Sequence, residues 1–125
     1  MKQIISTSNA PQAIGPYSQA VEANGFVFVS GQIPIVPATG QIPEGIEAQT
    51  EQVMRNIGAI LEAAGLNYSN VVKTTVLLKS IADFATMNGI YAKYFTAECP
   101  ARAAFEVGAL PKGALIEVEV IAAKN

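Results

Sequence analysis

The chain has 125 residues, which is enough for one folding domain, residues 1–125, because two cores of half that size would each be marginal. Its net charge of −2 argues against tight binding to the phosphates of a nucleic acid. Only 14% of its residues are charged, against about 25% in an average soluble domain, so we expect part of the surface to be covered in an oligomer.

The first half of the chain predicts three short strands, which cover residues 3–6, 19–23 and 26–30. Asn24 and Gly25 stand between the second and third strands and are a strong hairpin signal, so these two strands should be antiparallel neighbours. The segment Phe26–Val29 is apolar at every position. A strand of this kind is expected to be buried on both faces.

A proline-rich loop over residues 31–45 is followed by the clearest helix, residues 46–64. The apolar residues of this helix fall on one stripe at helical spacing, which comprises Ile46, Val53, Ile57, Ile60, Leu61 and Ala64. Arg55 lies off the stripe, on a face that we expect to be solvated. Gly65 supplies a stop signal directly after it.

The second half predicts a strand at residues 71–79, a second helix, and two strands at residues 103–107 and 115–122. Ser80 and Asp83 resemble a capping box at the start of the helix. Its apolar stripe is formed by Phe84, Met87, Tyr91 and Tyr94 or Phe95.

The order β β β α β α β β predicts an α+β fold in which two helices cover one face of a mostly antiparallel or mixed sheet. The second face would then have no helix over it. Because the strands are apolar at both parities, we expect this face to pack against other subunits.

The absence of histidine excludes a Ser-His-Asp triad, imidazole general-base catalysis and almost every zinc site. Cys99 is the only cysteine, so no intramolecular disulfide is possible and nothing nearby would activate its thiol. We therefore expect no metal and no cofactor. Neither a signal segment nor an apolar stretch long enough to span a membrane is evident, which predicts a cytosolic protein with no membrane partner.

The last predicted strand places Leu115, Glu117, Glu119 and Ile121 on one face. Two carboxylates therefore lie in the middle of an apolar row. The simplest interpretation is a solvated strand face. The alternative is that at least one carboxylate is partly buried and needs a donor.

Arg102 lies directly before the preceding strand and is one of only two arginines. An arginine there is more often part of a surface ion pair than a ligand clamp. Its planar group is nevertheless the best side chain for gripping a carboxylate by two parallel hydrogen bonds. Two loop motifs are weaker candidates: Tyr17 could present its phenol at a pocket mouth, and Gly31, after Ser30, could let a ligand approach the backbone.

Several motifs together resemble the Rid family, the reactive intermediate deaminases formerly called YjgF, and most closely its RidA subgroup. In chain order these motifs are Ile14–Gln19, Val29–Pro34, Val72–Val76, Pro100–Val107, Leu110–Ala114 and Ile116–Glu119. The resemblance runs from about Ile14 to Ile121.

This resemblance implies a chorismate-mutase-like fold and a homotrimer whose sheets form a central barrel with three ligand clefts between subunits. It implies hydrolysis of 2-imino acids, which pyridoxal-phosphate enzymes generate, to 2-oxo acids and ammonia. Carried over by motif, Arg102 would bind the substrate carboxylate and Glu117 would position or activate water. Tyr17, Ser30 and Gly31 would line the cleft, and main-chain groups near Ala104 and Gly31 could hold the imine nitrogen or the water.

Ala104 stands where many bacterial members have a cysteine, so redox control by that cysteine does not transfer. Two other functions remain open at this stage. One is a non-catalytic protein that binds or senses a small carboxylate in the same cleft. The other is an RNA-directed or translation-inhibiting role, and the net charge argues against tight binding to phosphates.

Overall fold

The computed structural model describes residues 1–124, which form one sheet and two α-helices. The strands are β1 (Gln3–Ile5), β2 (Ala20–Ala23), β3 (Phe26–Gln32), β4 (Val71–Leu78), β5 (Ala101–Glu106) and β6 (Ile116–Ala123). The helices are α1 (Ile46–Ala63) and α2 (Phe84–Tyr91), with short 3-10 turns at Tyr68–Asn70, Ile81–Asp83 and Pro111–Gly113. The predicted α+β class and element order are confirmed.

The sheet has the strand order β1-β2-β3-β6-β4-β5. Only β4 and β5 are parallel, since α2 forms the crossover between them; every other pairing is antiparallel. Asn24 (φ 53°) and Gly25 (φ 82°) form the predicted two-residue hairpin between β2 and β3. The last two strands are not neighbours, because β4 lies between β5 and β6. The order of the elements in the sequence does not predict this arrangement.

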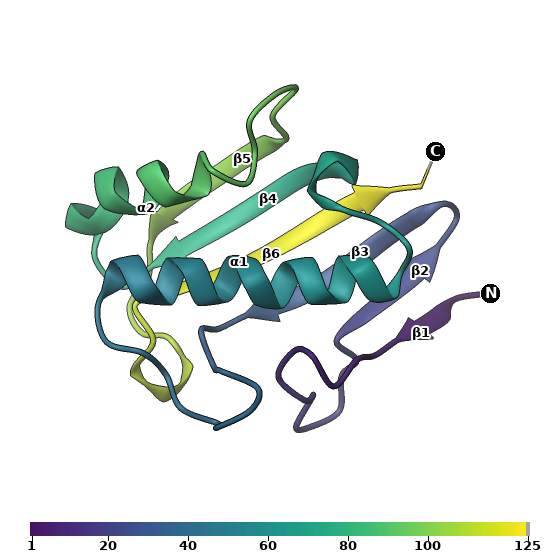
Figure 1. Cartoon of the computed structure of the whole chain (residues 1–125), viewed down its shortest axis with the longest axis horizontal. Coiled ribbons are helices and arrows are strands. Elements are labelled where there is room, and N and C mark those ends of the chain that lie inside the picture. Colours follow the sequence, from purple (N-terminus) through teal and green to yellow (C-terminus); the bar gives the residue numbers. More distant parts are fainter. Residues whose placement is uncertain (125) are drawn as a thin grey trace.

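Both helices lie on the same face of the sheet, as Figure 1 shows. Helix α1 packs on β6 and β3, and α2 packs beside α1. On β6 the residues that face the helices are all buried, namely Ile116, Val118, Val120 and Ala122. The parity predicted for this strand is therefore confirmed, and Glu117 and Glu119 lie on the opposite face.

The second face of the sheet, which we call the open face, has no helix over it. Three large apolar side chains of β3 and β5 on it remain 42–49% exposed: Phe26, Phe28 and Phe105. The expectation that Phe26–Val29 is buried on both faces is therefore wrong for a single chain. Val27 and Val29 are buried beneath α1, whereas no layer of this chain covers Phe26 and Phe28.

The second helix begins and ends differently from its prediction. Ser80 caps a 3-10 turn, because its hydroxyl accepts a hydrogen bond from Ala82 N at 3.2 Å, and Asp83 makes no side-chain cap. The helix ends at Tyr91, where tighter turns replace it before Tyr94 and Phe95. The predicted capping box is therefore absent, and the apolar stripe extends beyond the helix itself.

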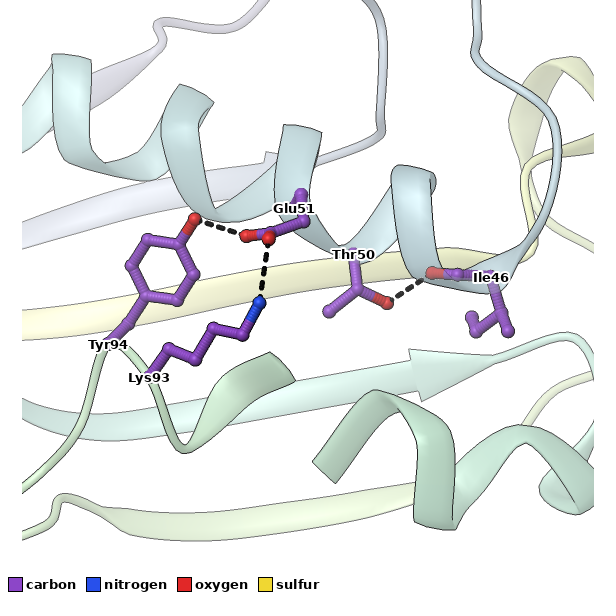
Figure 2. Close-up of polar contacts among 5 residues, drawn as sticks. All are labelled: Ile46, Thr50, Glu51, Lys93 and Tyr94. Atoms are coloured by element: carbon purple, nitrogen blue, oxygen red, sulfur yellow. Dashed lines mark hydrogen bonds and ion pairs between the residues drawn. The ribbon is translucent and has the colours of Figure 1, made fainter. Parts of the chain in front are cut away.

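A polar cluster joins α1 to the turn that follows α2, as Figure 2 shows. Glu51 of α1 accepts a hydrogen bond from the Tyr94 hydroxyl at 2.5 Å and forms an ion pair with Lys93 at 3.1 Å. These contacts lower the pKa of the Glu51 carboxyl, with the Tyr94 bond as the largest cause.

Within residues 1–124, neither helix has the length and apolar character that a membrane span requires.

Candidate active site

Glu117 lies on the open face next to Gly31 of β3. A bulge interrupts the pairing of β3 and β6 between Val29 and Gln32, which places Gly31 against the carboxylate. A Cβ at Gly31 would lie 3.0 Å from Cδ of Glu117 and closer still to Oε2. Only glycine therefore leaves room for the carboxylate at this position.

Burial raises the pKa of the Glu117 carboxyl, and the negative charge of Glu119 raises it further. Within residues 1–124 no side chain or backbone N–H donates a hydrogen bond to the Glu117 carboxylate, and the residue lines a cleft, so its oxygens can accept from a water or a ligand. Glu119 is exposed, whereas Glu117 is half-buried. Of the two interpretations of this strand, the partly buried carboxylate is confirmed for Glu117.

Glu117 opens into a cleft of about 470 Å³. Its walls come from the loops after β1 and β3 and from the 3-10 turn before β6. The residues that line it include Ile14, Tyr17, Gly31, Ile33, Lys112 and Glu117. The predicted residues Tyr17, Gly31 and Glu117 are thus brought together.

Buried amides fix the loops that form these walls. Gln19, which is 3% exposed, donates through Nε2 to the carbonyls of Thr7, Ala10 and Pro11 and accepts from Thr7 N. Asn56 of α1 donates through Nδ2 to the carbonyls of Ile33 and Ile35. The cleft is therefore largely preformed, because its walls are tied to the core.

Ser30 has a different place from the one predicted for it. Its hydroxyl donates to the carbonyl of Ser18 at 2.5 Å, and its backbone N–H donates to the carbonyl of Gln19. It is not among the residues that line the cleft in this chain. Its contacts hold the end of the loop that carries Tyr17.

Arg102 lies in a second hollow of about 440 Å³, beside α2. Its Nη1 donates to Oδ1 of Asn88 at 2.6 Å. Its guanidinium carbon lies 4.9 Å from the ring centre of Tyr91 and 5.3 Å from that of Phe84. Cys99 also lines this hollow. Ala104 follows two residues later on the same face of β5 and is half-buried.

Arg102 and Glu117 are on opposite faces of the sheet. Arg102 is paired with Thr74 of β4, which is fully buried on the helix side, whereas Glu117 is paired with Leu77 three residues further along. Paired residues share a face and residues three apart do not. One chain therefore provides two separate halves of the predicted site.

Sequence reasoning missed Asn88, Phe84 and Gln19 as residues that shape the site. Phe84 and Tyr91 were assigned only to the apolar stripe of α2. Asn88 interrupts that stripe at i+4 from Phe84. A polar residue inside an apolar stripe was the available signal.

Comparison with known proteins identifies the family. A family model described as endoribonuclease L-PSP matches residues 7–124. The chain is 55% identical over 122 residues to Reactive Intermediate Deaminase A, chloroplastic, of Arabidopsis thaliana, covering 97% of this chain and 65% of that protein. It is 49% identical over 126 residues to 2-iminobutanoate/2-iminopropanoate deaminase of Mus musculus, covering 100% of this chain and 93% of that protein.

A solved structure agrees with these matches. A conserved Rid-family protein, YyfA from Yersinia pestis, superposes with a TM-score of 0.96 at 53% identity, covering 98% of this chain and 99% of that one. The chain belongs to the Rid family, to which the endoribonuclease L-PSP model corresponds. The resemblance drawn from its motifs is confirmed.

Proposed function

We propose that this chain is a 2-iminobutanoate/2-iminopropanoate deaminase, which hydrolyses reactive imine and enamine products of pyridoxal-phosphate enzymes to 2-oxo acids and ammonia. The observation that carries the proposal is identity of about half of all positions, over the whole chain, to a deaminase of that name. The two half-sites supply the chemistry that such a substrate needs.

Arg102 binds the substrate carboxylate through its planar fork. Glu117 accepts a proton from a water molecule, whose oxygen attacks C2 of the protonated imine. Glu117 then returns that proton to the nitrogen of the carbinolamine, and the C–N bond breaks with its electron pair on the leaving ammonia. The C2 hydroxyl gives its proton back to the Glu117 carboxylate as the 2-oxo acid forms, and ammonia takes up this proton to leave as ammonium. The protonated imine is already electrophilic, so orientation and one placed water are sufficient.

The other predicted residues surround the reacting atoms. Tyr17 and Gly31 line the wall next to Glu117, and main-chain groups near Gly31 and Ala104 hold the imine nitrogen or the water. Ser30 supports the loop that carries Tyr17 through its bond to Ser18.

The active protein in this proposal is a homotrimer whose sheets form a central barrel around their open faces. Two observations support it. The open face carries three exposed phenylalanine side chains, and Arg102 and Glu117 lie on opposite faces of the sheet of one chain. A cleft between neighbouring subunits would bring the Arg102 of one chain to the Glu117 of another.

The test is an imine hydrolysis assay with a threonine dehydratase generating the substrate in place. We expect 2-oxobutanoate to form well above the spontaneous rate. Arg102→Ala should abolish the acceleration, and Glu117→Gln should reduce turnover by roughly two or more powers of ten, the scale for loss of a general base. Glu119→Gln, on the same face, should be nearly silent at neutral pH.

A different outcome would favour the binding alternative. If the wild-type protein binds 2-oxobutanoate but leaves imine decay at the spontaneous rate, the cleft serves a carboxylate sensor and the deaminase proposal is rejected. The family description also names a ribonuclease. Cleavage of RNA by the same purified protein is therefore measured in a separate assay. We expect no cleavage, because the chain has a net charge of −2 and no histidine.

A further inference from the structure

One side of α2 forms a cradle for Arg102. Phe84, Asn88 and Tyr91 are spaced at i, i+4 and i+7, so they lie above one another on the helix. All three contact the guanidinium of Arg102. Two of the contacts are aromatic faces, and the third is a short hydrogen bond.

The cradle leaves part of the guanidinium free. A guanidinium has five N–H donors in a fixed plane, and Asn88 Oδ1 takes one of those on Nη1. The rings of Phe84 and Tyr91 restrict rotation of the plane. Donors on Nη2 and Nε remain for a carboxylate.

Asn88 orients this group without neutralising it. The hollow around Arg102 is lined by uncharged residues, which are Asn88, Tyr91, Ala92, Phe95, Cys99 and Pro100. The ion pairs within residues 1–124 are Lys93 with Glu51 and Lys124 with Glu22, so neither involves Arg102. Glu106, on the same strand face, accepts from Ile81 N instead.

We propose that Asn88 is a positioning and specificity-determining residue for anionic substrates. It holds Arg102 in place through a neutral acceptor, so that the positive charge and a two-donor edge stay available for a substrate carboxylate. This inference rests on the proposed function, because it concerns how that function recognises its substrate. An aspartate at this position would orient the guanidinium equally well but would occupy its charge.

The test compares Asn88→Asp with Asn88→Ala. Aspartate has the size of asparagine and keeps an oxygen acceptor beside Nη1, whereas alanine removes the contact. A purely structural role predicts that aspartate is tolerated and alanine is harmful. Our inference predicts the reverse order for ligand binding, because aspartate competes with the substrate carboxylate for Arg102.

The probe is 2-oxobutanoate, titrated by calorimetry into the full-length protein in its native assembly. We expect Asn88→Asp to weaken binding by roughly a hundredfold and Asn88→Ala by roughly tenfold, the range for hydrogen bonds to charged groups. In the hydrolysis assay the same variants should raise KM far more than they lower kcat. Thermal unfolding should show Asn88→Asp to be at least as stable as Asn88→Ala.

Two reference variants make the result specific. Thr86→Asp adds the same charge to the exposed side of α2 and should bind the probe like the wild type. Arg102→Ala should abolish binding. The inference is overturned if Asn88→Asp binds 2-oxobutanoate as tightly as Asn88→Ala or more tightly. It is also overturned if Thr86→Asp weakens the binding of 2-oxobutanoate as much as Asn88→Asp does.

The inference and the proposed function fail in different ways. In one case the wild type binds 2-oxobutanoate and the variants weaken binding in the expected order, but the wild type does not accelerate imine hydrolysis. The role of Asn88 then stands, and the proposed enzyme activity is rejected. A protein that hydrolyses imines with equal activity in Asn88→Asp and Asn88→Ala loses the role of Asn88 alone. No binding of 2-oxobutanoate by the wild type contradicts the inference directly.

Discussion

Glu117 carries a carboxyl whose pKa is raised by burial first and by the charge of Glu119 second. In the proposed mechanism Glu117 acts as a base and must be ionised, so activity should fall as the pH drops through this raised pKa. Removing the charge of Glu119 lowers the pKa of Glu117. The acid limb of the pH–rate profile should therefore move to lower pH in Glu119→Gln, with little change at neutral pH.

The pH dependence of kcat/KM, measured for the wild type and for Glu119→Gln, tests this prediction. Glu47→Gln, on the exposed surface of α1, is the matched control and should leave the acid limb in place. A limb at the same pH in Glu119→Gln and the wild type would show that another group titrates.

Gly31 owes its identity to the close approach of Glu117. In Gly31→Ala, the new Cβ would overlap Oε2 and force the carboxylate away from its place in the cleft. We expect a loss of turnover close to that of Glu117→Gln, with the protein still folded. The measurements are steady-state kinetics and a crystal structure of the variant.

Gly89 of α2 is the matched control for this substitution, since a Cβ there meets no atom within 4 Å. Gly89→Ala should leave turnover unchanged and stabilise the helix by roughly 0.5–1 kcal/mol. Full activity in Gly31→Ala would mean that the position of the Glu117 carboxylate is not critical.

At the scale of elements, local patterns predicted what depends on neighbours in sequence. The alternation in β6, the Asn24-Gly25 hairpin and the stripe of α1 each follow from residues a few positions apart, and each is confirmed. The order of β4, β5 and β6 depends on a crossover through α2, which no local pattern encodes.

The geometry of the candidate site also depends on the strand order, so the sequence could not predict it. The sequence predicts Arg102 and Glu117 from the chemistry of their side chains, and each of them lines a hollow in the structure. Their separation onto opposite faces required the strand order, because only the pairing with Thr74 and Leu77 fixes their sides. The role of Asn88 could not be predicted without the position of α2 relative to Arg102, since the two residues meet through a hydrogen bond between side chains that lie far apart in sequence.

The contact between α1 and the turn after α2 gives a pH-dependent contribution to stability. The Glu51 pKa is lowered chiefly by the Tyr94 hydrogen bond, and second by Lys93. A folded-state pKa below the unfolded value means that the stabilisation is present above the unfolded pKa and is lost as the pH falls through the folded one. Tyr94→Phe should therefore cost about 1 kcal/mol at neutral pH.

Chemical denaturation at several pH values checks this expectation. The difference between the wild type and Tyr94→Phe should shrink as the pH falls below the usual range of a glutamate. Lys93→Met is the comparison, because the Lys93 side chain is 62% exposed and ion pairs of such side chains contribute little. A larger loss in Lys93→Met than in Tyr94→Phe would reverse the assigned order of the two contacts.

At the scale of the whole molecule, the open face determines the assembly that we expect. Phe28 is 42% exposed at the middle of this face, although its neighbours Val27 and Val29 are buried. Phe28→Asp should leave the fold of the chain intact and place a charge where subunits meet. Light scattering should show a trimer for the wild type and smaller species for the variant. A monodisperse wild-type monomer at micromolar concentration would rule out the shared cleft.

The same assembly predicts that two inactive variants restore each other. In this assembly each cleft would take Arg102 from one subunit and Glu117 from the next, so a mixed trimer of Arg102→Ala and Glu117→Gln chains would contain clefts with both native residues. Random exchange at equal amounts gives about one intact cleft in four, since the two residues come from independent chains in a closed ring. Partial denaturation and refolding of the mixture should therefore recover about a quarter of wild-type turnover, whereas each variant refolded alone stays inactive. Mixed trimers that are verified by mass spectrometry and still lack activity would place Arg102 and Glu117 in separate sites.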